Sequence, residues 1–119
     1  MREKRYEDAI GDFSRTVQLN PKVAQAYYNR ALAYYALEKY PEAMLDLNQA
    51  VSLNAKDGSA QYVRGLIFER RACVEQAKQA FTASMALGNQ VAKLKLEGMA
   101  KNDGAKKDGK QSGSNACLD

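Results

Sequence analysis

The chain repeats itself every 34 residues, and this repeat constrains its fold more than any other feature of the sequence. The segments KRYEDAIGDFSRTVQLNP, EKYPEAMLDLNQAVSLNA and ACVEQAKQAFTASMALGN align without a gap. Residues of similar kind recur in register in all three: Ala9, Ala43 and Ala77; Phe13, Leu47 and Phe81; Leu19, Leu53 and Leu87. A fixed period of this length indicates units of two structural elements each, which stack on one another to build a continuous core.

Each unit is predicted to consist of two helices. Apolar residues recur at helical spacing in five segments: Tyr6–Leu19, Ala24–Leu37, Pro41–Leu53, Ser59–Arg71 and Val74–Leu87. The start of the first segment is approximate. Pro41 suits the first turn of a helix, where its missing N–H costs nothing. Asn20 precedes Pro21, and a residue before proline is pushed out of the helical region, so the first helix should end there. Turns this short make neighbouring helices antiparallel.

Small residues recur where two helices have to approach closely. Ala31 and Gly65 occupy matching places in the first helices of two units, as Ala43 and Ala77 do in the second helices. Large side chains beside them fill the remaining space, which is how stacked helical hairpins reach native packing density. Helical spacing also directs three tyrosines into this stack: Tyr27, Tyr34 and Tyr40.

These residues and their period resemble the tetratricopeptide repeat family, whose unit is a 34-residue helix–turn–helix. The resemblance implies an all-α fold: a right-handed α-solenoid of antiparallel helix pairs, with about two and a half repeats and a C-terminal capping helix. Departures from the family pattern are Gln61 in place of a large residue, Val74 in place of tyrosine, and Ala55 and Asn89 in place of proline. They loosen the last repeat without changing its type.

One repeat domain is predicted over residues 1–100, followed by a polar, glycine-rich segment. Its parts are a half repeat 1–23, full repeats 24–57 and 58–91, a capping helix 90–100, and a disordered tail 101–119. The half repeat contains only a second helix. Two interpretations stay open for it: the chain is a fragment of a longer repeat array, or the half repeat is an atypical N-terminal cap.

The composition argues against catalysis, cofactors and metals. The chain has no histidine, which is the commonest general base and metal ligand, and it has no glycine-rich phosphate loop. The net charge of +4 comes from interspersed charges of both signs, so we expect no nucleic-acid partner. No apolar run approaches the length of a membrane span, so we expect no membrane partner. We therefore predict a protein that is not an enzyme.

A peptide-binding groove is the functional site that the resemblance implies. In this family the first helix of each pair lines the concave surface, and residues seven apart share a helix face. We expect a protein or peptide partner of unknown identity to contact Tyr28, Asn29, Leu32, Tyr35, Tyr62, Val63, Leu66, Glu69 and Arg70. Tyrosine offers a large contact area at low entropy cost, and an amide such as that of Asn29 can pair with a peptide backbone.

Three other functions remain open at this stage. The chain could be a structural spacer, or it could self-associate as a homodimer through the incomplete N-terminal repeat, which leaves Ile10, Phe13 and Val17 partly uncovered. The third, less favoured, is the carboxylate clamp of co-chaperone members of the family. Asn29 matches the asparagine of that clamp, but Ser59 and Val63 stand where the clamp has a lysine and an arginine.

Overall fold

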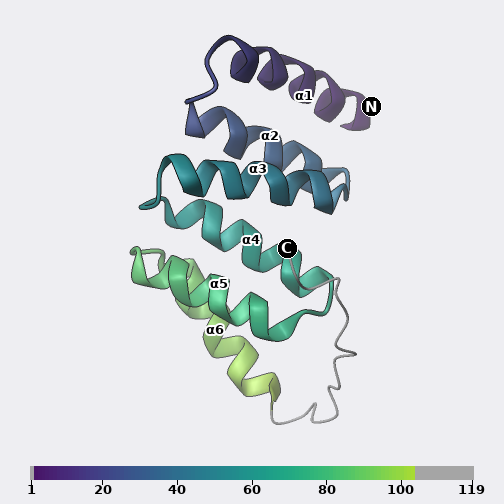
Figure 1. Ribbon diagram of the computed structural model, residues 1–119. Coiled ribbons are helices and arrows are strands. Elements are labelled where there is room, and N and C mark those ends of the chain that lie inside the picture. Colours follow the sequence, from purple (N-terminus) through teal and green to yellow (C-terminus); the bar gives the residue numbers. More distant parts are fainter. Residues whose placement is uncertain (1, 104–119) are drawn as a thin grey trace.

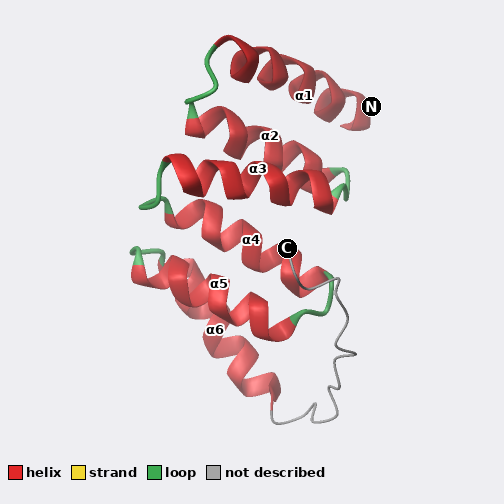
Figure 2. Ribbon diagram, in the orientation of Figure 1, coloured by secondary structure: helices red, strands yellow, loops and turns green. Residues whose placement is uncertain are grey.

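The computed structural model describes residues 2–103 of the chain, and the side chains of residues 3–100. Within that range helices joined by short loops are the only regular secondary structure, without a strand, which confirms the predicted all-α class (Figure 2). The helices are α1 (Arg2–Leu19), α2 (Ala24–Ala36), α3 (Tyr40–Leu53), α4 (Gly58–Arg70), α5 (Val74–Ala86) and α6 (Gln90–Asp103). They stack in chain order from α1 at one end to α6 at the other, which gives an elongated solenoid (Figure 1).

Two helix ends differ from expectation by more than one residue, and five differ by one residue. Helix α1 begins at Arg2 rather than near Tyr6, because Glu3 places an acidic side chain in its first turn, where it stabilises the N-terminal end. Helix α6 runs on to Asp103, three residues past the expected capping helix. Helices α2, α4 and α5 each end one residue early, at Ala36, Arg70 and Ala86. Helices α3 and α4 each begin one residue early, at Tyr40 and Gly58. The remainder of the tail expected to be disordered lies outside the described residues.

Left-handed residues close the short turns after the first helix of each pair and after α5. Glu38, Ala72 and Gly88 have φ angles of 61°, 62° and 99°. Beyond each of them the next backbone N–H donates to a carbonyl inside the preceding helix, as Lys39 does to Tyr34 at 2.9 Å. This 6→1 bond satisfies a carbonyl that the helix end leaves without a partner. The turn therefore reverses the chain without losing backbone hydrogen bonds.

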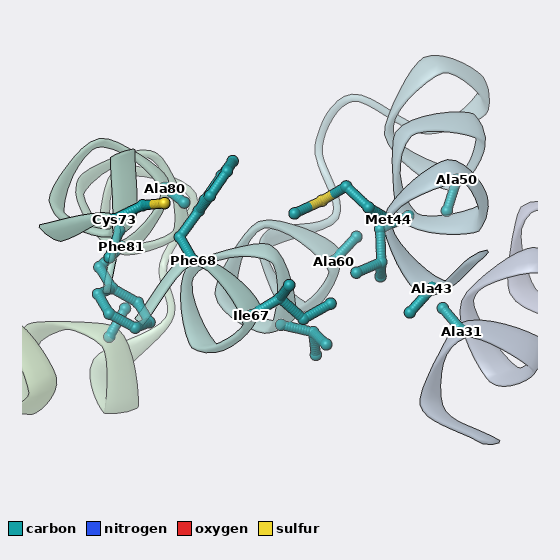
Figure 3. Packing of buried hydrophobic residues seen from close by; sticks show 14 residues of the cluster. Ala31, Ala43, Met44, Ala50, Ala60, Ile67, Phe68, Cys73, Ala80 and Phe81 are labelled. Carbon is teal, nitrogen blue, oxygen red and sulfur yellow. The ribbon is translucent and has the colours of Figure 1, made fainter. Parts of the chain in front are cut away.

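The core consists of small residues on facing helices with large side chains between them. Ala31, Ala43 and Ala77 are all 0% exposed, which confirms their predicted role in close helix packing. In Figure 3, Ile67 of α4 lies between Phe81 of α5 and Ala43 of α3, so α4 contributes to both repeats. The three tyrosines expected in the stack are half-buried and packed against this core: Tyr27, Tyr34 and Tyr40.

Gly65 lies where the two helices of the last full repeat approach closely. A Cβ atom added there would lie 2.5 Å from Cε1 of Phe81, a distance that no real Cβ contact shows. Ala31 occupies the equivalent position one repeat earlier, where the smaller Leu47 is the equivalent of Phe81. The larger ring of the last repeat therefore requires the smaller residue on the facing helix.

A buried ion pair joins the helices of the first full repeat. Nε and one terminal nitrogen of Arg30 on α2 donate to Oδ2 and Oδ1 of Asp46 on α3, at 2.8 and 2.7 Å. The other terminal nitrogen donates to the hydroxyl of Ser14 on α1 at 3.0 Å. One guanidinium thus connects three consecutive helices. The sequence analysis did not single out this pair.

Candidate functional site

Helices α2 and α4 are the first helices of consecutive repeats, and two tyrosines of α2 reach across to α4. Tyr28, near the start of α2, interacts with Asp57 and Ser59 at the start of α4. Tyr35, near the end of α2, lies under Arg70 at the end of α4, with the guanidinium carbon 5.7 Å from the ring centroid. The start of α2 lies beside the start of α4, and the end of α2 lies beside the end of α4. The two helices are therefore parallel and in register.

The environment of Tyr28 keeps its phenol neutral. Burial is the largest cause that raises the pKa of Tyr28, and the nearby carboxylate of Asp57 raises it further. A hydrogen bond with Ser59 acts in the opposite direction. Asp57 also caps α4, because its Oδ1 accepts from the backbone N–H of Ser59 at 2.9 Å. Tyr28 is therefore a partly desolvated ring with a polar edge at the junction of two repeats.

Tyr35 is held from two sides and keeps part of its surface in solvent. Its ring centroid lies 5.8 Å from that of Tyr40, the first residue of α3, with the rings tilted. The exposed guanidinium of Arg70 covers another part of it. A cation over an aromatic ring is attracted by the negative face of the ring. Leu32, one helical turn before Tyr35, is 37% exposed and leaves an apolar side chain at this surface.

The structure divides the nine predicted residues rather than gathering them at one place. Five of them form the α2–α4 surface: Tyr28, Asn29, Leu32, Tyr35 and Arg70. Asn29 is half-buried, and its Oδ1 accepts from Nε2 of Gln25 at 3.4 Å.

The other predicted residues serve the last repeat. The ring of Tyr62 lies 5.5 Å from that of Phe81 on α5, and Leu66 is half-buried against the core. A carboxylate oxygen of Glu69 accepts from Nζ of Lys95 on α6 at 2.9 Å. Val63 is 4% exposed, so it packs in the core and would not touch a peptide on the surface.

Sequence reasoning missed Lys95, which joins α4 to α6. Besides its bond to Glu69, its ammonium nitrogen lies 5.9 Å from the ring centroid of Phe81. The spacing of apolar residues predicted the capping helix. It did not indicate which polar residue of that helix faces α4.

Among the side chains that the structure describes, no three His, Cys, Asp or Glu residues are grouped closely enough to hold a metal ion. Of the helices within residues 2–103, none combines the length and apolar character needed to cross a membrane.

Comparison with known proteins identifies the family. A family model described as tetratricopeptide repeat matches residues 1–57. The first tetratricopeptide repeat domain of Spaghetti (RPAP3), bound to the HSP90 peptide SRMEEVD, is 28% identical. That alignment covers 82% of this chain and 79% of the other, with a TM-score of 0.76.

The second tetratricopeptide repeat domain of human RPAP3, in complex with the HSP70 peptide SGPTIEEVD, is 32% identical. This alignment covers 82% of this chain and 83% of the other, with a TM-score of 0.74. The search of curated proteins returned no match. The period, the stacked helix pairs and these similarities agree, and the chain belongs to the tetratricopeptide repeat family.

Proposed function

We propose that this chain is a protein-interaction module that binds a peptide segment of a partner on the α2–α4 surface. The observation that carries the proposal is the partly solvent-exposed apolar row of Tyr28, Leu32 and Tyr35 along one first helix. The two tetratricopeptide repeat domains to which the chain is similar are bound to peptides, which supports a ligand of the same class.

The chemistry of the surface suits an extended peptide. Two tyrosine rings supply broad, rigid contacts whose conformational entropy cost is low, and Leu32 supplies an aliphatic contact between them. The exposed guanidinium of Arg70 can bind a carboxylate of the peptide with two parallel hydrogen bonds. A peptide with an apolar residue and a nearby acidic residue fits these groups.

The proposal is tested by selecting ligands from a display library of random peptides with the 119-residue chain. The affinity of a selected peptide is then measured by calorimetry for the parent, Leu32→Ala and Tyr35→Ala. We expect each variant to bind about 1–2 kcal/mol more weakly, because each removes one apolar anchor of the contact. Helicity measured by circular dichroism checks that Tyr35→Ala, which also loses contacts with Tyr40 and Arg70, still folds.

Leu45→Ala provides the matched control. Leu45 lies on α3, is 71% exposed and is not part of the α2–α4 surface. Its removal should leave the affinity of the selected peptide unchanged. If the library yields no ligand, or if Leu32→Ala and Tyr35→Ala bind as tightly as the parent, the proposed function is wrong and a structural spacer becomes the better description.

A further inference from the structure

The two ends of the α2–α4 surface carry groups of opposite charge. At one end the carboxylate of Asp57 lies close enough to Tyr28 to raise the pKa of its phenol. At the other end the exposed guanidinium of Arg70 lies over Tyr35, with its carbon 5.7 Å from the ring centroid. Leu32 is 37% exposed and lies between the two tyrosines along α2. A peptide along this surface therefore meets a negative group, an apolar side chain and a positive group in turn.

The ring of Tyr35 already carries a cation of the protein itself. The negative face of an aromatic ring attracts a guanidinium, so Tyr35 holds Arg70 at this end of the surface. Glu38 also acts on Arg70, but it is the last and smallest of the causes that raise the pKa of Arg70. Because Arg70 is exposed, its guanidinium can donate two parallel hydrogen bonds to a carboxylate of the ligand. This end of the surface favours an acidic residue of the peptide.

The ring of Tyr28 has an acidic neighbour instead of a basic one. Oδ1 of Asp57 accepts from the backbone N–H of Ser59 at 2.9 Å, which fixes the carboxylate at the start of α4. A half-buried ring and a carboxylate beside it both attract a cation, the ring through its negative face and the carboxylate through its charge. The partial positive charge at the start of α4 offsets part of this attraction. This end therefore favours a lysine or arginine of the peptide, and we expect it to contribute less to affinity than Arg70 does.

The spacing of the tyrosines on α2 sets the spacing of the charges in the peptide. Tyr28 and Tyr35 are seven residues apart on one helix face, which separates them by about 10.5 Å along the axis. An extended peptide advances about 3.3 Å per residue, so about three or four residues span that distance. Leu32 lies about 6 Å from Tyr28 along the same axis. An apolar residue of the peptide therefore falls between its two charged residues.

We propose that the peptide bound by the α2–α4 surface carries a basic and an acidic residue about three or four positions apart, with an apolar residue between them. The basic residue binds at Tyr28 and Asp57, the acidic residue at Arg70, and the apolar residue on Leu32. This inference rests on the proposed function, which it narrows to peptides of one charge pattern.

Peptides selected from the random library test the pattern first. We expect the enriched sequences to share a Lys or Arg and an Asp or Glu about three or four positions apart, with an apolar residue between them. One selected peptide is then compared by calorimetry with two variants of itself. Norleucine replaces its basic residue in the first variant, and glutamine replaces its acidic residue in the second. Each variant should bind more weakly than the selected peptide, because each loses one charge.

Charge reversal in the protein identifies the site of the acidic residue. Arg70→Glu should weaken the selected peptide at least about tenfold, because it places like charges opposite each other. Replacing the acidic residue of the peptide by lysine should restore most of that affinity on Arg70→Glu. Arg70→Met removes the charge without reversing it and should weaken binding by about threefold to fivefold. It replaces Arg70→Glu in the comparison if circular dichroism shows that the reversed variant has lost helicity.

Asp57→Asn identifies the site of the basic residue. Asparagine still caps α4 but carries no charge, so the selected peptide should bind about threefold more weakly. The norleucine variant of the peptide should bind Asp57→Asn and the parent equally well. Arg15→Glu and Asp8→Asn on α1 are the matched controls, since both residues are exposed and lie outside the α2–α4 surface. Both control variants should bind the selected peptide as the parent does.

The outcomes separate this inference from the proposed function. Enriched peptides that bind through Leu32 but lack either charge would overturn the inference and leave the proposed function standing. A selected peptide whose affinity changes with neither Arg70→Glu nor Asp57→Asn would do the same. A library without a ligand, or a ligand insensitive to both Leu32→Ala and Tyr35→Ala, would instead contradict the proposed function itself.

Discussion

Asp46 holds the guanidinium of Arg30 with two hydrogen bonds, 2.8 Å from Nε and 2.7 Å from a terminal nitrogen. The two side chains are 7% and 18% exposed. The hydrogen bond with Asp46 is the main cause that raises the pKa of Arg30, which favours the charged form of the guanidinium. Because the same guanidinium reaches Ser14 of α1, the pair stabilises the junction of the half repeat with the first full repeat.

Removal of Asp46 should destabilise the protein strongly. Asp46→Ala leaves a largely buried guanidinium without its carboxylate, which costs about 3 kcal/mol. Urea unfolding followed by circular dichroism measures the loss, and Asp8→Ala on the exposed surface of α1 is the control. The double variant Arg30→Met/Asp46→Leu should recover most of the lost stability, because apolar residues of similar volume often replace a buried ion pair without net cost. A double variant no more stable than Asp46→Ala would contradict this explanation.

The close approach of Gly65 to Phe81 predicts that substitutions at these two positions are coupled in their effect on stability. Gly65→Ala would bring a Cβ to 2.5 Å from the Phe81 ring, so the ring or the helices have to shift. We expect a loss of about 1–3 kcal/mol, which outweighs the better helix propensity of alanine.

A smaller side chain at position 81 should relieve that clash. Gly65→Ala/Phe81→Leu recreates the combination of Ala31 and Leu47 found one repeat earlier. The free energies of unfolding of the two single variants and the double variant form a double-mutant cycle. We expect the double variant to be more stable than the sum of the single losses predicts. Strict additivity would show that the two residues do not compete for the same space.

The period of the sequence predicted the fold because the small residues at the helix crossings recur in matching places. Ala31, Ala43 and Ala77 were identified by size and spacing alone, and all three are buried. The candidate binding surface was harder to predict, because the sequence of one helix face does not show which of its residues the next helix covers. Val63 matches the half-buried Asn29 in register, yet it is 4% exposed. The Arg30–Asp46 pair could have been suspected from the sequence, because Arg64 repeats Arg30 and Asp12 repeats Asp46 at a distance of 34 residues.

Peptides with a free C-terminal carboxylate should gain nothing from that group on this chain. The two similar domains are bound to the peptides SRMEEVD and SGPTIEEVD. In this chain Ser59 carries no charge and Val63 is buried, at the places where a carboxylate clamp has its cations. Charge-assisted hydrogen bonds of this kind contribute about 1.5–3 kcal/mol each, so their loss removes most of the affinity for the terminus.

Fluorescence anisotropy of the two peptides, each with a free and an amidated C-terminus, checks this prediction. We expect the free and amidated forms to bind equally weakly. Tight binding that amidation abolishes would show that other residues of this chain replace the missing cations.

Tyr28 makes the stability of the protein sensitive to alkaline pH. Its pKa is raised above the ordinary 10.0, first by burial and then by the carboxylate of Asp57. The folded protein therefore holds this proton more tightly than the unfolded chain does. The resulting stabilisation is fully present below pH about 10 and is lost as the pH rises through the folded-state pKa. Between those limits the parent should lose stability with pH more steeply than Tyr28→Phe, which keeps the ring but has no proton to release.

Asp57→Asn separates the two causes of the shift. Asparagine still caps α4 but carries no charge, so it removes the contribution of the carboxylate and leaves that of burial. The pKa of Tyr28, read from the difference in phenolate absorbance between each protein and its Tyr28→Phe counterpart, should be lower in Asp57→Asn than in the parent. It should nevertheless stay above the ordinary value, because burial is the larger cause. A pKa unchanged by Asp57→Asn would show that the carboxylate does not act on this phenol.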